Sequence, residues 1–451
     1  MPQPQFEDHP AHVRRLVDAA LAAADPAGAL LQAWRNLPPA NRPAQPCVLV
    51  AAGKASVPMA RAVIEGQLVK PAVGVVVVPA GSPPPPSLAA AGLRVMEADH
   101  PLPSQRNLIA AQAVLDAGRI ASSRGIPLVV LLSGGASAHL TFPERGLTLS
   151  DVRVLTDALL RSGATIREIN TVRKHIERLK GGNLARAASP SPVFAFILAD
   201  VLGEPPPLDV IASGPTAPDP TTYADALEVL ERKAVVAPAP ILERLRAGAK
   251  GKHPETLKDP DEIRAKIHNI VIGSNSLAVS AAADAARSLG FHIAEARLNV
   301  DGEAAEVGEQ FAQRLLELRA AASGPIALIW GGETTVTVRG PGCGGRGGAG
   351  SGGRNQEVAL AAAVRLADQQ NVAVAAFGTD GIDGVTPPGE KPAAGAIVTG
   401  RTAAHARGAI IDLRAALSGH DTFPALKRLG AHIHTGPTGT NVNDLMAALA
   451  Y

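Results

Sequence analysis

The chain contains few of the residues on which several classes of protein depend. It has 451 residues but only two cysteines, which excludes a disulfide framework and a cysteine-based zinc site and favours a reducing, cytoplasmic setting. Aromatic residues make up 3%, which is too few for the stacking platforms of proteins that bind single-stranded nucleic acid. The formal net charge of +2 offers no basic excess for nucleic acid either. We therefore expect a small-molecule ligand.

Long hydrophobic runs are also missing. The apolar runs at 73–78 and 128–132 are far shorter than the roughly 20 residues needed to cross a bilayer, and the amino terminus is polar where a secretory signal would be apolar. We expect neither a membrane span nor export. The length exceeds one ordinary core and predicts two domains of roughly 200 residues each. The oligomeric state stays open between a monomer and a homodimer.

Short β-branched runs alternate with longer alanine-rich amphipathic stretches, which is the pattern of βαβ units in a mainly parallel sheet. The sequence predicts an α/β protein with two separate sheets. The expected strands are 48–51, 73–78, 128–132, 193–198, 270–272, 326–329, 334–338 and 372–377, and the expected helices are 57–66, 104–122, 149–162, 222–232, 242–247, 276–289, 303–321 and 356–369.

The segment 237–260 is rich in proline, lysine and glycine, which is typical of a domain boundary. We place the boundary near residue 240, so that the predicted domains are residues 1–240 and 241–451. The proline run at 83–86 is interpreted as a stiff surface loop without a function of its own.

Two strand-to-helix loops suggest phosphate binding, because ligands of open α/β sheets bind at the carboxyl ends of the strands. Lys54 lies in Gly53-Lys54-Ala55 after the strand at 48–51, although the upstream glycine of a P-loop is absent. The alternative is a solvated lysine at a helix start. The second loop, Ser133-Gly134-Gly135-Ala136-Ser137, could wrap a phosphate, or it could be a tight turn in which a serine caps a helix.

Three aspartates follow strands and are candidates for a Mg²⁺ ligand or a base. Asp200 ends the strand at 193–198, and Asp380 and Asp383 share a glycine-rich turn after the strand at 372–377. The structural alternative is an ordinary Asp-Gly turn. The histidines show no zinc-ligand spacing, and no G-x-S-x-G elbow of a serine hydrolase is present.

A glycine tract at 340–353 leads through Arg354 into a predicted helix. It contains a literal G-x-G-x-x-G, but the helix is expected about eight residues later than a dinucleotide fold requires. We interpret the tract as a mobile lid over the active site, with a passive surface insertion as the alternative. Either Arg346 or Arg354 could then reach a phosphate, and Arg354 has the better context.

Together these segments resemble the glycerate 2-kinase family, whose carboxyl-terminal half is called the MOFRL domain. The resemblance covers nearly the whole chain in order. It rests on Gly53-Lys54-Ala55, residues 131–137, residues 170–175, Lys180-Gly181-Gly182, residues 211–216, Gly345-Arg346, residues 353–357, Gly378-Thr379-Asp380-Gly381 and residues 438–444.

The resemblance implies two α/β/α domains, the first of them Rossmann-like, with the active site in a cleft between the domains. The implied reaction transfers the γ-phosphoryl group of ATP to the 2-hydroxyl of D-glycerate, with Mg²⁺, giving 2-phosphoglycerate. Lys54 would neutralise phosphate charge, and the planar fork of Arg354 would clamp the phosphoryl group or the glycerate carboxylate.

Further residues are candidates for the site. Lys180 is a candidate substrate ligand beside Lys54 and Arg354. Asn275 joins Ser133, Gly134, Gly135, Ala136 and Ser137 among the candidate phosphate- or nucleotide-binding residues. Asp200, Asp380 and Asp383 remain the candidate metal ligands.

Two rival functions are considered. An NAD(P)H-dependent hydroxypyruvate reductase is a label that members of this family have also carried, but no segment combines a glycine fingerprint that opens a helix with an acidic residue about 20 positions later. A non-catalytic sensor of sugar acids or nucleotides is disfavoured by the retained Lys54, Arg354 and carboxylates.

Overall fold

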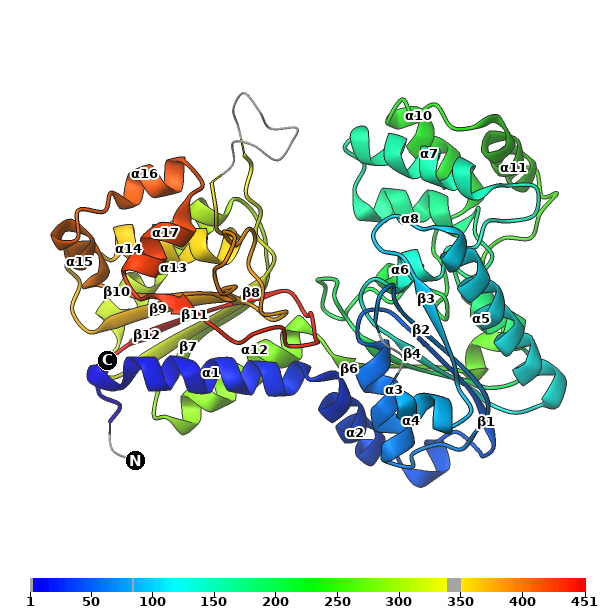
Figure 1. Cartoon of the computed structure of the whole chain (residues 1–451), viewed down its shortest axis with the longest axis horizontal. Coiled ribbons are helices and arrows are strands. Elements are labelled where there is room, and N and C mark those ends of the chain that lie inside the picture. The colour runs from blue at the N-terminus through cyan, green and yellow to red at the C-terminus, as the bar shows by residue number, and fades with distance from the viewer. Residues whose placement is uncertain (1–2, 83–84, 339–349) are drawn as a thin grey trace. The chain divides into compact units, whose positions relative to one another are not determined.

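A computed structural model describes residues 3–82, 85–338 and 350–451 (Figure 1). Its residue contacts divide the chain into two compact units. The first unit comprises Pro26–Val201 and Pro206–Ile272; the second comprises the chain up to Asp25, Leu202–Pro205 and the chain from Gly273 onward. Strand β6 (Ile267–Gly273) joins the first sheet and helix α1 (His9–Ala24) belongs to the second unit, so neither unit is one continuous stretch of chain. The domain boundary near residue 240 stays a prediction.

The first unit is built around a six-stranded sheet with the order β3-β2-β1-β4-β5-β6. The pairs β3/β2, β2/β1, β1/β4 and β4/β5 are parallel. Because β2 and β3 lie to one side of β1, and β5 and β6 lie beyond β4, the strand order reverses between β1 and β4. In open α/β sheets ligands bind beside the carboxyl ends of the strands at such a reversal. The bounds are β1 (Cys47–Ala52), β2 (Pro71–Pro79), β3 (Arg94–Ala98), β4 (Leu128–Leu132) and β5 (Val193–Leu198).

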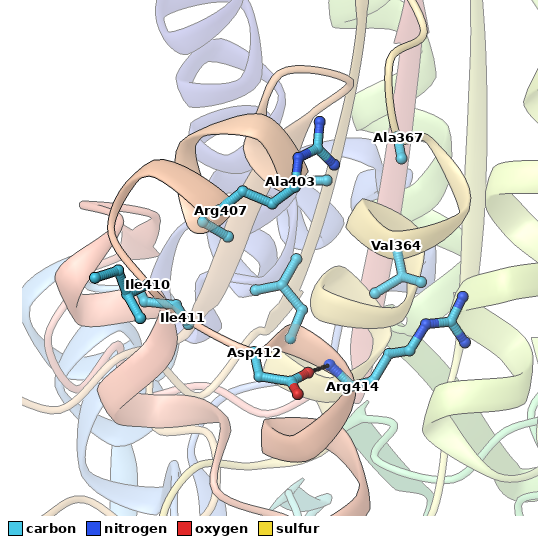
Figure 2. A pocket seen from close by; sticks show the side chains of 10 residues that line it. Val364, Ala367, Ala403, Arg407, Ile410, Ile411, Asp412 and Arg414 are labelled. Carbon is cyan, nitrogen blue, oxygen red and sulfur yellow. Dashed lines mark hydrogen bonds between the residues drawn. The ribbon is translucent and has the colours of Figure 1, made fainter.

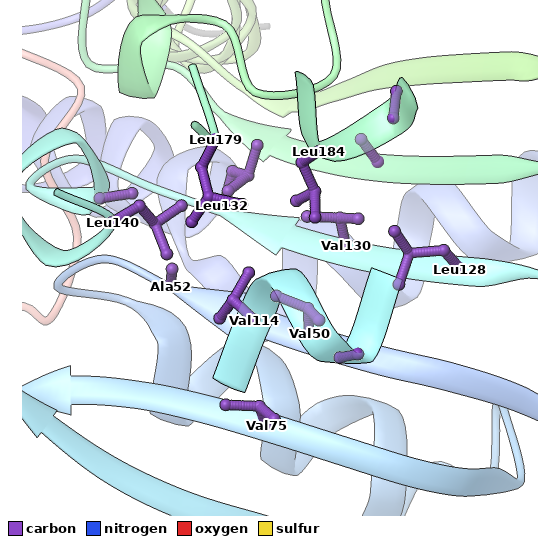
Figure 3. Close-up of a cluster of buried hydrophobic side chains, with 14 of the residues drawn as sticks. Val50, Ala52, Val75, Val114, Leu128, Val130, Leu132, Leu140, Leu179 and Leu184 are labelled. Carbon is purple, nitrogen blue, oxygen red and sulfur yellow. The ribbon is translucent and has the colours of Figure 1, made fainter. Parts of the chain in front are cut away.

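Helices cover this sheet and form a separate cluster. Every residue of β1 and of β4 is buried, and the side chains of Val50 and Val130 pack with Val114 of α5 and Leu184 of α9 (Figure 3). The apolar residues of α7, α8, α10 and α11 form a second small core. The helices are α2 (Pro26–Asn36), α3 (Ser56–Glu65), α4 (Pro86–Ala90), α5 (Gln105–Arg124), α6 (Ala136–His139), α7 (Leu149–Arg161), α8 (Ile166–Lys174), α9 (Asn183–Ala188), α10 (Tyr223–Arg232) and α11 (Ala239–Ala249).

Local sequence signals fix where these helices begin and end. Ser104 precedes α5 and accepts a hydrogen bond from the backbone N–H of Arg106, while Asn107 reaches back to complete a capping box. Gly125 ends the same helix at φ +64°, a left-handed conformation that costs glycine little. Threonines start α7, α8 and α10 in the same way as Ser104 starts α5.

The second unit contains a mixed six-stranded sheet with the order β11-β10-β9-β12-β8-β7. The pair β7/β8 is parallel, and the remaining four pairs are antiparallel. Strand β12 therefore lies in the middle of the sheet, hydrogen-bonded to both β8 and β9. The bounds are β7 (His292–Val300), β8 (Ile326–Gly332), β9 (Val372–Gly378), β10 (Gly395–Thr399), β11 (His432–Ile433) and β12 (Asp444–Ala450).

Helices cover both faces of the second sheet (Figure 1). On one face α13 and α14 pack against Leu328 and Trp330 of β8. On the other, α12 contacts β7 and β8 and is itself covered by α1. The helices are α12 (Asn275–Ser288), α13 (Ala304–Ala321), α14 (Arg354–Arg365), α15 (Thr402–Gly408), α16 (Leu413–Ser418) and α17 (Thr422–Arg428). In the described part of the chain no helix is both long and apolar enough to cross a membrane.

The predicted α/β class with two sheets is confirmed, and the strands expected at 48–51, 128–132, 193–198 and 372–377 are found as β1, β4, β5 and β9. The strand expected at 334–338 is wrong, because Thr335 there forms only an isolated bridge with Glu303. The Rossmann-like character of the first domain stays a prediction.

Candidate functional site

The loops that follow β1 and β4 are hydrogen-bonded to each other, at the point in the first sheet where the strand order reverses. The backbone N–H of Lys54 donates to the carbonyl of Gly134 at 2.8 Å, and the N–H of Ala55 donates to Ser133 Oγ at 3.0 Å. The two loops therefore form one rigid surface. The Lys54 side chain is exposed on it and, within the described residues, has no ion-pair partner.

Two glycines allow this close approach. Gly53 has φ +112°, and a Cβ atom built on it would lie 2.3 Å from Ser133 Oγ. A Cβ atom on Gly135 would lie 3.3 Å from Lys54 Cγ and 3.4 Å from His100 Cδ2. The Lys54 side chain therefore runs across Gly135 beside the His100 ring. Gly53 is required by its contact with Ser133, and Gly135 by its φ of +83°.

Two histidines next to Lys54 were not among the predicted site residues. His139 is fully buried, and its Nδ1 lies 3.3 Å from the N–H of Gly53 and accepts from it. Burial, followed by the charges of His100 and Lys54, lowers the pKa of His139 to about 4. Burial and Lys54 also lower the pKa of the exposed His100. Both rings are therefore neutral at neutral pH. His139 follows the predicted phosphate loop directly, but nothing in the sequence indicated its contact with Gly53.

The predicted phosphate loop divides into buried and accessible parts. Ser133 and Ala136 are buried, and the Ser133 hydroxyl accepts the hydrogen bond from Ala55, so both residues stabilise the turn. Gly134, Gly135 and Ser137 are half-buried. The Asp200 carboxylate lies beside the turn, because a Cβ atom on Gly134 would be 2.4 Å from Asp200 Oδ2. Lys54, this loop and Asp200 thus come together in the first unit, while their binding roles stay predictions.

Lys180 lies behind the loop. Its side chain is 1% exposed, and Nζ donates to the carbonyl of Ser137 at 2.7 Å and lies 2.9 Å from Glu177 Oε2. Burial lowers the pKa of Lys180 to about 8, against the opposing effect of Glu177. These contacts give Lys180 a structural role in holding Ser137. Its predicted contact with substrate gains no support from them.

Arg354 is the first residue of α14 and faces two carboxylates of the second unit. Its Nη1 lies 2.8 Å from Glu333 Oε1, and its Nε and Nη2 lie 2.6 and 3.1 Å from the two oxygens of Asp444. Burial raises the pKa of Asp444 to about 7, although the Arg354 charge opposes that rise. Burial alone would lower the pKa of Arg354, but Asp444 raises it overall. Arg354 is therefore permanently charged and held by its fork.

Asp383 caps the start of α14 from a distant turn. Its two carboxylate oxygens accept from the backbone N–H groups of Asn355 and Gln356 at 3.0 and 2.9 Å, and from the side-chain amides of both residues. Burial raises the pKa of Asp383, and these hydrogen bonds oppose the rise. The contacts favour a capping role over the predicted metal ligand. Asp380 is half-buried and accepts from the N–H of Ile382 at 3.1 Å.

Asn275 lies at the start of α12 and is buried. Its Nδ2 donates to the carbonyls of Val442 and Asp444 at 2.9 and 3.0 Å, which ties the helix to the entry of β12. Its predicted phosphate contact has no support in these interactions and stays a prediction.

Arg354, Asp380 and Asp383 line one pocket of the second unit, with a volume of about 520 Å³. Asp444 and His420 also line it. A second pocket in this unit, of about 510 Å³, has a mainly apolar wall from α14, α15 and α16 and carries none of the predicted site residues (Figure 2). The first of these pockets is therefore the better candidate for chemistry.

Some predictions concern residues that the structure does not describe, and one involves residues of both units. Residues 340–349 of the predicted lid, with Cys343 and Arg346, lie outside the described residues. Lys54 belongs to the first unit and Arg354 to the second, so their joint action in an inter-domain cleft stays a prediction.

Two carboxylates that hold Arg354 were missed by sequence reasoning. Glu333 follows β8, and its carboxylate also accepts from Asn443 Nδ2 at 2.9 Å. Asp444 stood at the end of a motif that supported the resemblance but carried no assigned role. The structure places it at the start of β12 beside the glycine ends of β8 and β9, a position that the sequence did not indicate because β12 was not predicted as a strand.

Comparisons with known proteins match the two parts of the chain to different family models. A family model described as "Domain of unknown function (DUF4147)" matches residues 12–246, and the model of the MOFRL family matches residues 326–444. A glycerate 2-kinase of Pyrococcus horikoshii is 38% identical over 447 residues, covering 96% of each chain. A putative hydroxypyruvate reductase of Agrobacterium vitis is 39% identical, covering 97% of this chain and 93% of the relative. A crystal structure of glycerate kinase from Thermotoga maritima superposes with a TM-score of 0.84 at 35% identity, covering 99% of this chain and 100% of that one.

Proposed function

Because this chain belongs to the glycerate 2-kinase family, we propose that it transfers the γ-phosphoryl group of ATP to the 2-hydroxyl of D-glycerate. The products are 2-phosphoglycerate, ADP and a proton. The observation that carries the proposal is the position of Lys54, an exposed and unpaired cation among the described residues, on the rigid surface where the β1 and β4 loops meet. Phosphoryl transfer depends mainly on positive charge and positioning, and this surface offers both.

In the proposed complex Lys54 neutralises the nucleotide phosphates as a point charge, and the backbone of Gly134 and Gly135 lies against them. Arg354 binds an oxyanion through its planar fork, either the transferred phosphoryl group or the glycerate carboxylate. The fork is pre-oriented by Asp444 and Glu333. The neutral state of His100 beside Lys54 leaves that face free of a second positive charge and makes His100 able to accept a proton.

Mg²⁺ is the metal that this reaction implies. Among the described residues no three histidine, cysteine, aspartate or glutamate side chains cluster closely enough to hold a metal by themselves. Kinase sites commonly hold Mg²⁺ by one or two carboxylates and the phosphates of the nucleotide, so Asp200 beside Gly134 fits such a site. The ion would neutralise charge on the β- and γ-phosphates when bound. Asp383 fits less well, because its oxygens already accept four hydrogen bonds.

A coupled assay tests the proposal. Purified protein with D-glycerate, ATP and Mg²⁺ should release ADP and form 2-phosphoglycerate, and Lys54→Ala and Arg354→Ala should abolish both. The same samples are given NADH and hydroxypyruvate without ATP. Oxidation of NADH together with no release of ADP would refute the kinase and support the reductase.

A further inference from the structure

Ser137 is held more firmly than its place in a glycine-rich loop requires. Its carbonyl accepts from Lys180 Nζ at 2.7 Å and from Arg173 Nη2 at 3.2 Å. Both cations also pair with the fully buried Glu177, at 2.9 and 3.2 Å. The Ser137 hydroxyl lies 2.6 Å from Ser213 Oγ. Backbone and side chain are thus fixed from two directions, while the residue itself is half-buried and keeps an accessible side.

The neighbouring groups decide which hydroxyl donates. Asn170 Nδ2 donates to the carbonyl of Val210 at 3.3 Å, which leaves Asn170 Oδ1 facing Ser213 Oγ at 2.9 Å. Turning the amide around would place its oxygen against the Val210 carbonyl, two acceptors without a hydrogen between them. Ser213 therefore gives its single hydrogen to Asn170.

The donor role of Ser213 determines the role of the Ser137 hydroxyl. A hydroxyl has one hydrogen and two lone pairs, so Ser213, having donated to Asn170, can only accept from Ser137. The Ser137 hydrogen points into the protein. A ligand that reaches this hydroxyl therefore finds only its lone pairs.

The backbone at Ser213 has a conformation that non-glycine residues disfavour, and the fold keeps Ser213 in place despite this cost. Ala212 and Ser213 have φ +53° and +60°, and each such residue costs about 1 kcal/mol when it is not glycine. Ser213 is completely buried, so it makes no contact with solvent that would explain the conformation. Its hydroxyl does, however, connect Ser137 with Asn170.

We propose that Ser137 Oγ accepts a hydrogen bond from a hydroxyl group of the acceptor substrate, and so recognises a hydroxy acid by its hydroxyl. This inference rests on the proposed function. The inference assigns the Ser137 hydroxyl a partner other than phosphate, because ionised phosphate and carboxylate oxygens carry no hydrogen to give. The predicted role of the loop backbone in phosphate binding is separate from it. The chain of hydrogen bonds ends at an amide oxygen, which is no base, so Ser137 orients the hydroxyl and does not deprotonate it.

The test compares ligands that differ by one hydroxyl. The dissociation constants of D-glycerate, D-lactate and 3-hydroxypropanoate are measured by calorimetry with the wild-type protein and with Ser137→Ala. Each of the two analogues lacks one hydroxyl of D-glycerate. The wild type should prefer D-glycerate over one analogue by at least about tenfold, and Ser137→Ala should reduce that preference by about tenfold while the affinity for the analogue stays the same.

Controls keep the result interpretable. Ser162→Ala removes a half-buried hydroxyl that donates to the carbonyl of Leu159, and it should leave all three constants unchanged. If Ser137→Ala does not fold, Ser213→Ala frees the Ser137 hydrogen and should reduce the same preference. Circular dichroism establishes folding in each case.

Two results would overturn the inference. One is an unchanged preference in the folded Ser137→Ala protein. The other is a loss of affinity for inorganic phosphate or ATP with the hydroxyl preference intact, which would make Ser137 a donor to phosphate. Binding is measured without turnover, so a protein that discriminates through Ser137 but does not phosphorylate D-glycerate would refute the proposed function and leave this inference standing.

Discussion

Arg354 and Asp444 form a two-pronged ion pair in which Nε and Nη2 of the guanidinium lie 2.6 and 3.1 Å from the two carboxylate oxygens. Asp444 is 1% exposed, whereas Arg354 keeps about a third of its side chain accessible. The buried carboxylate therefore aims a guanidinium whose outer edge still meets solvent. In this arrangement Asp444 positions the guanidinium, and Arg354 is the residue that would bind a ligand.

Replacing Arg354 by lysine should lower kcat/KM for D-glycerate by about a hundredfold or more without unfolding the protein. Lysine keeps the charge but loses the planar fork that matches an oxyanion and Asp444 at once. Steady-state kinetics and a thermal melt measure the two effects. Arg407→Lys changes an exposed arginine paired with Asp368 and should be neutral in both. Equal activity of the two variants would show that the planar shape of the Arg354 guanidinium is not needed for catalysis.

Asp444 should make folding stability depend on pH. Burial raises the pKa of Asp444 from 3.8 to about 7, so between these pH values the folded protein holds a proton that the unfolded chain has released. The free energy of unfolding should therefore fall as pH rises through this window, by a few kcal/mol at most. Urea titrations between pH 4 and pH 8 measure it. Asp444→Asn should flatten the slope, whereas the exposed Asp412→Asn should keep it.

The position of the Lys54 ammonium should be detectable through the pKa values of His100 and His139. Its charge contributes to the lowered pKa of His100 and His139, after the larger effect of burial. Lys54→Ala removes a positive charge that opposes protonation of both rings, so both pKa values should rise. Titration of the histidine resonances by NMR measures the change. Lys70→Ala, at an exposed lysine outside this surface, should shift neither ring; an unmoved His100 in Lys54→Ala would place the ammonium elsewhere.

Asp383→Ala should destabilise the second unit by about 1–3 kcal/mol, because four donors at the start of α14 lose their acceptor in a buried place. Chemical denaturation gives the value. Asp412 caps the short exposed helix α16 through the N–H groups of Arg414 and Ala415, and Asp412→Ala should cost about 1 kcal/mol or less. A smaller cost at Asp383 than at Asp412 would contradict the capping role and revive a metal role.

Gly53→Ala should damage both stability and activity. Its φ of +112° disfavours any side chain, and the new Cβ atom would lie 2.3 Å from Ser133 Oγ. Gly302→Ala is a matched control, since Gly302 has φ +115° but its nearest neighbour to a Cβ atom is 3.6 Å away. The difference between the two variants isolates the contact between the loops. Equal melting temperatures would show that the loops can separate at little cost.

The sequence predicted those parts of the molecule whose local pattern and tertiary role agree. β-Branched runs became the buried strands β1, β4 and β5, and glycine with a cation at a strand end correctly located the loops that meet beside Lys54. β12 was missed because it is built largely of alanine and leucine, which favour helices when considered locally. Burial on both faces between β8 and β9 overrides that preference. The edge strand β7 was missed because polar residues interrupt its apolar ones and most of the strand is at least partly exposed.

The site was predictable only where a residue's role is local. Lys54 and Arg354 stand in recognisable turns, but what surrounds them comes from elsewhere in the chain. The capping of α14 by Asp383, the pairing of Arg354 with Asp444 and the burial of Lys180 against Glu177 all depend on tertiary contacts. An aspartate after a strand looks the same in sequence whether it will hold a metal or a helix.

The central position of β12 also affects the order in which the two sheets can form during synthesis of the chain. All six strands of the first sheet have been synthesised once residue 273 is made. Within the described residues, the two halves of the second sheet, β7–β8 and β9–β10–β11, pair with each other only through β12, residues 444–450. Until then each half presents an open edge on which another chain could dock. Translation that stalls or stops shortly before residue 444 should therefore yield aggregates held together through the second unit, even where the first has already folded.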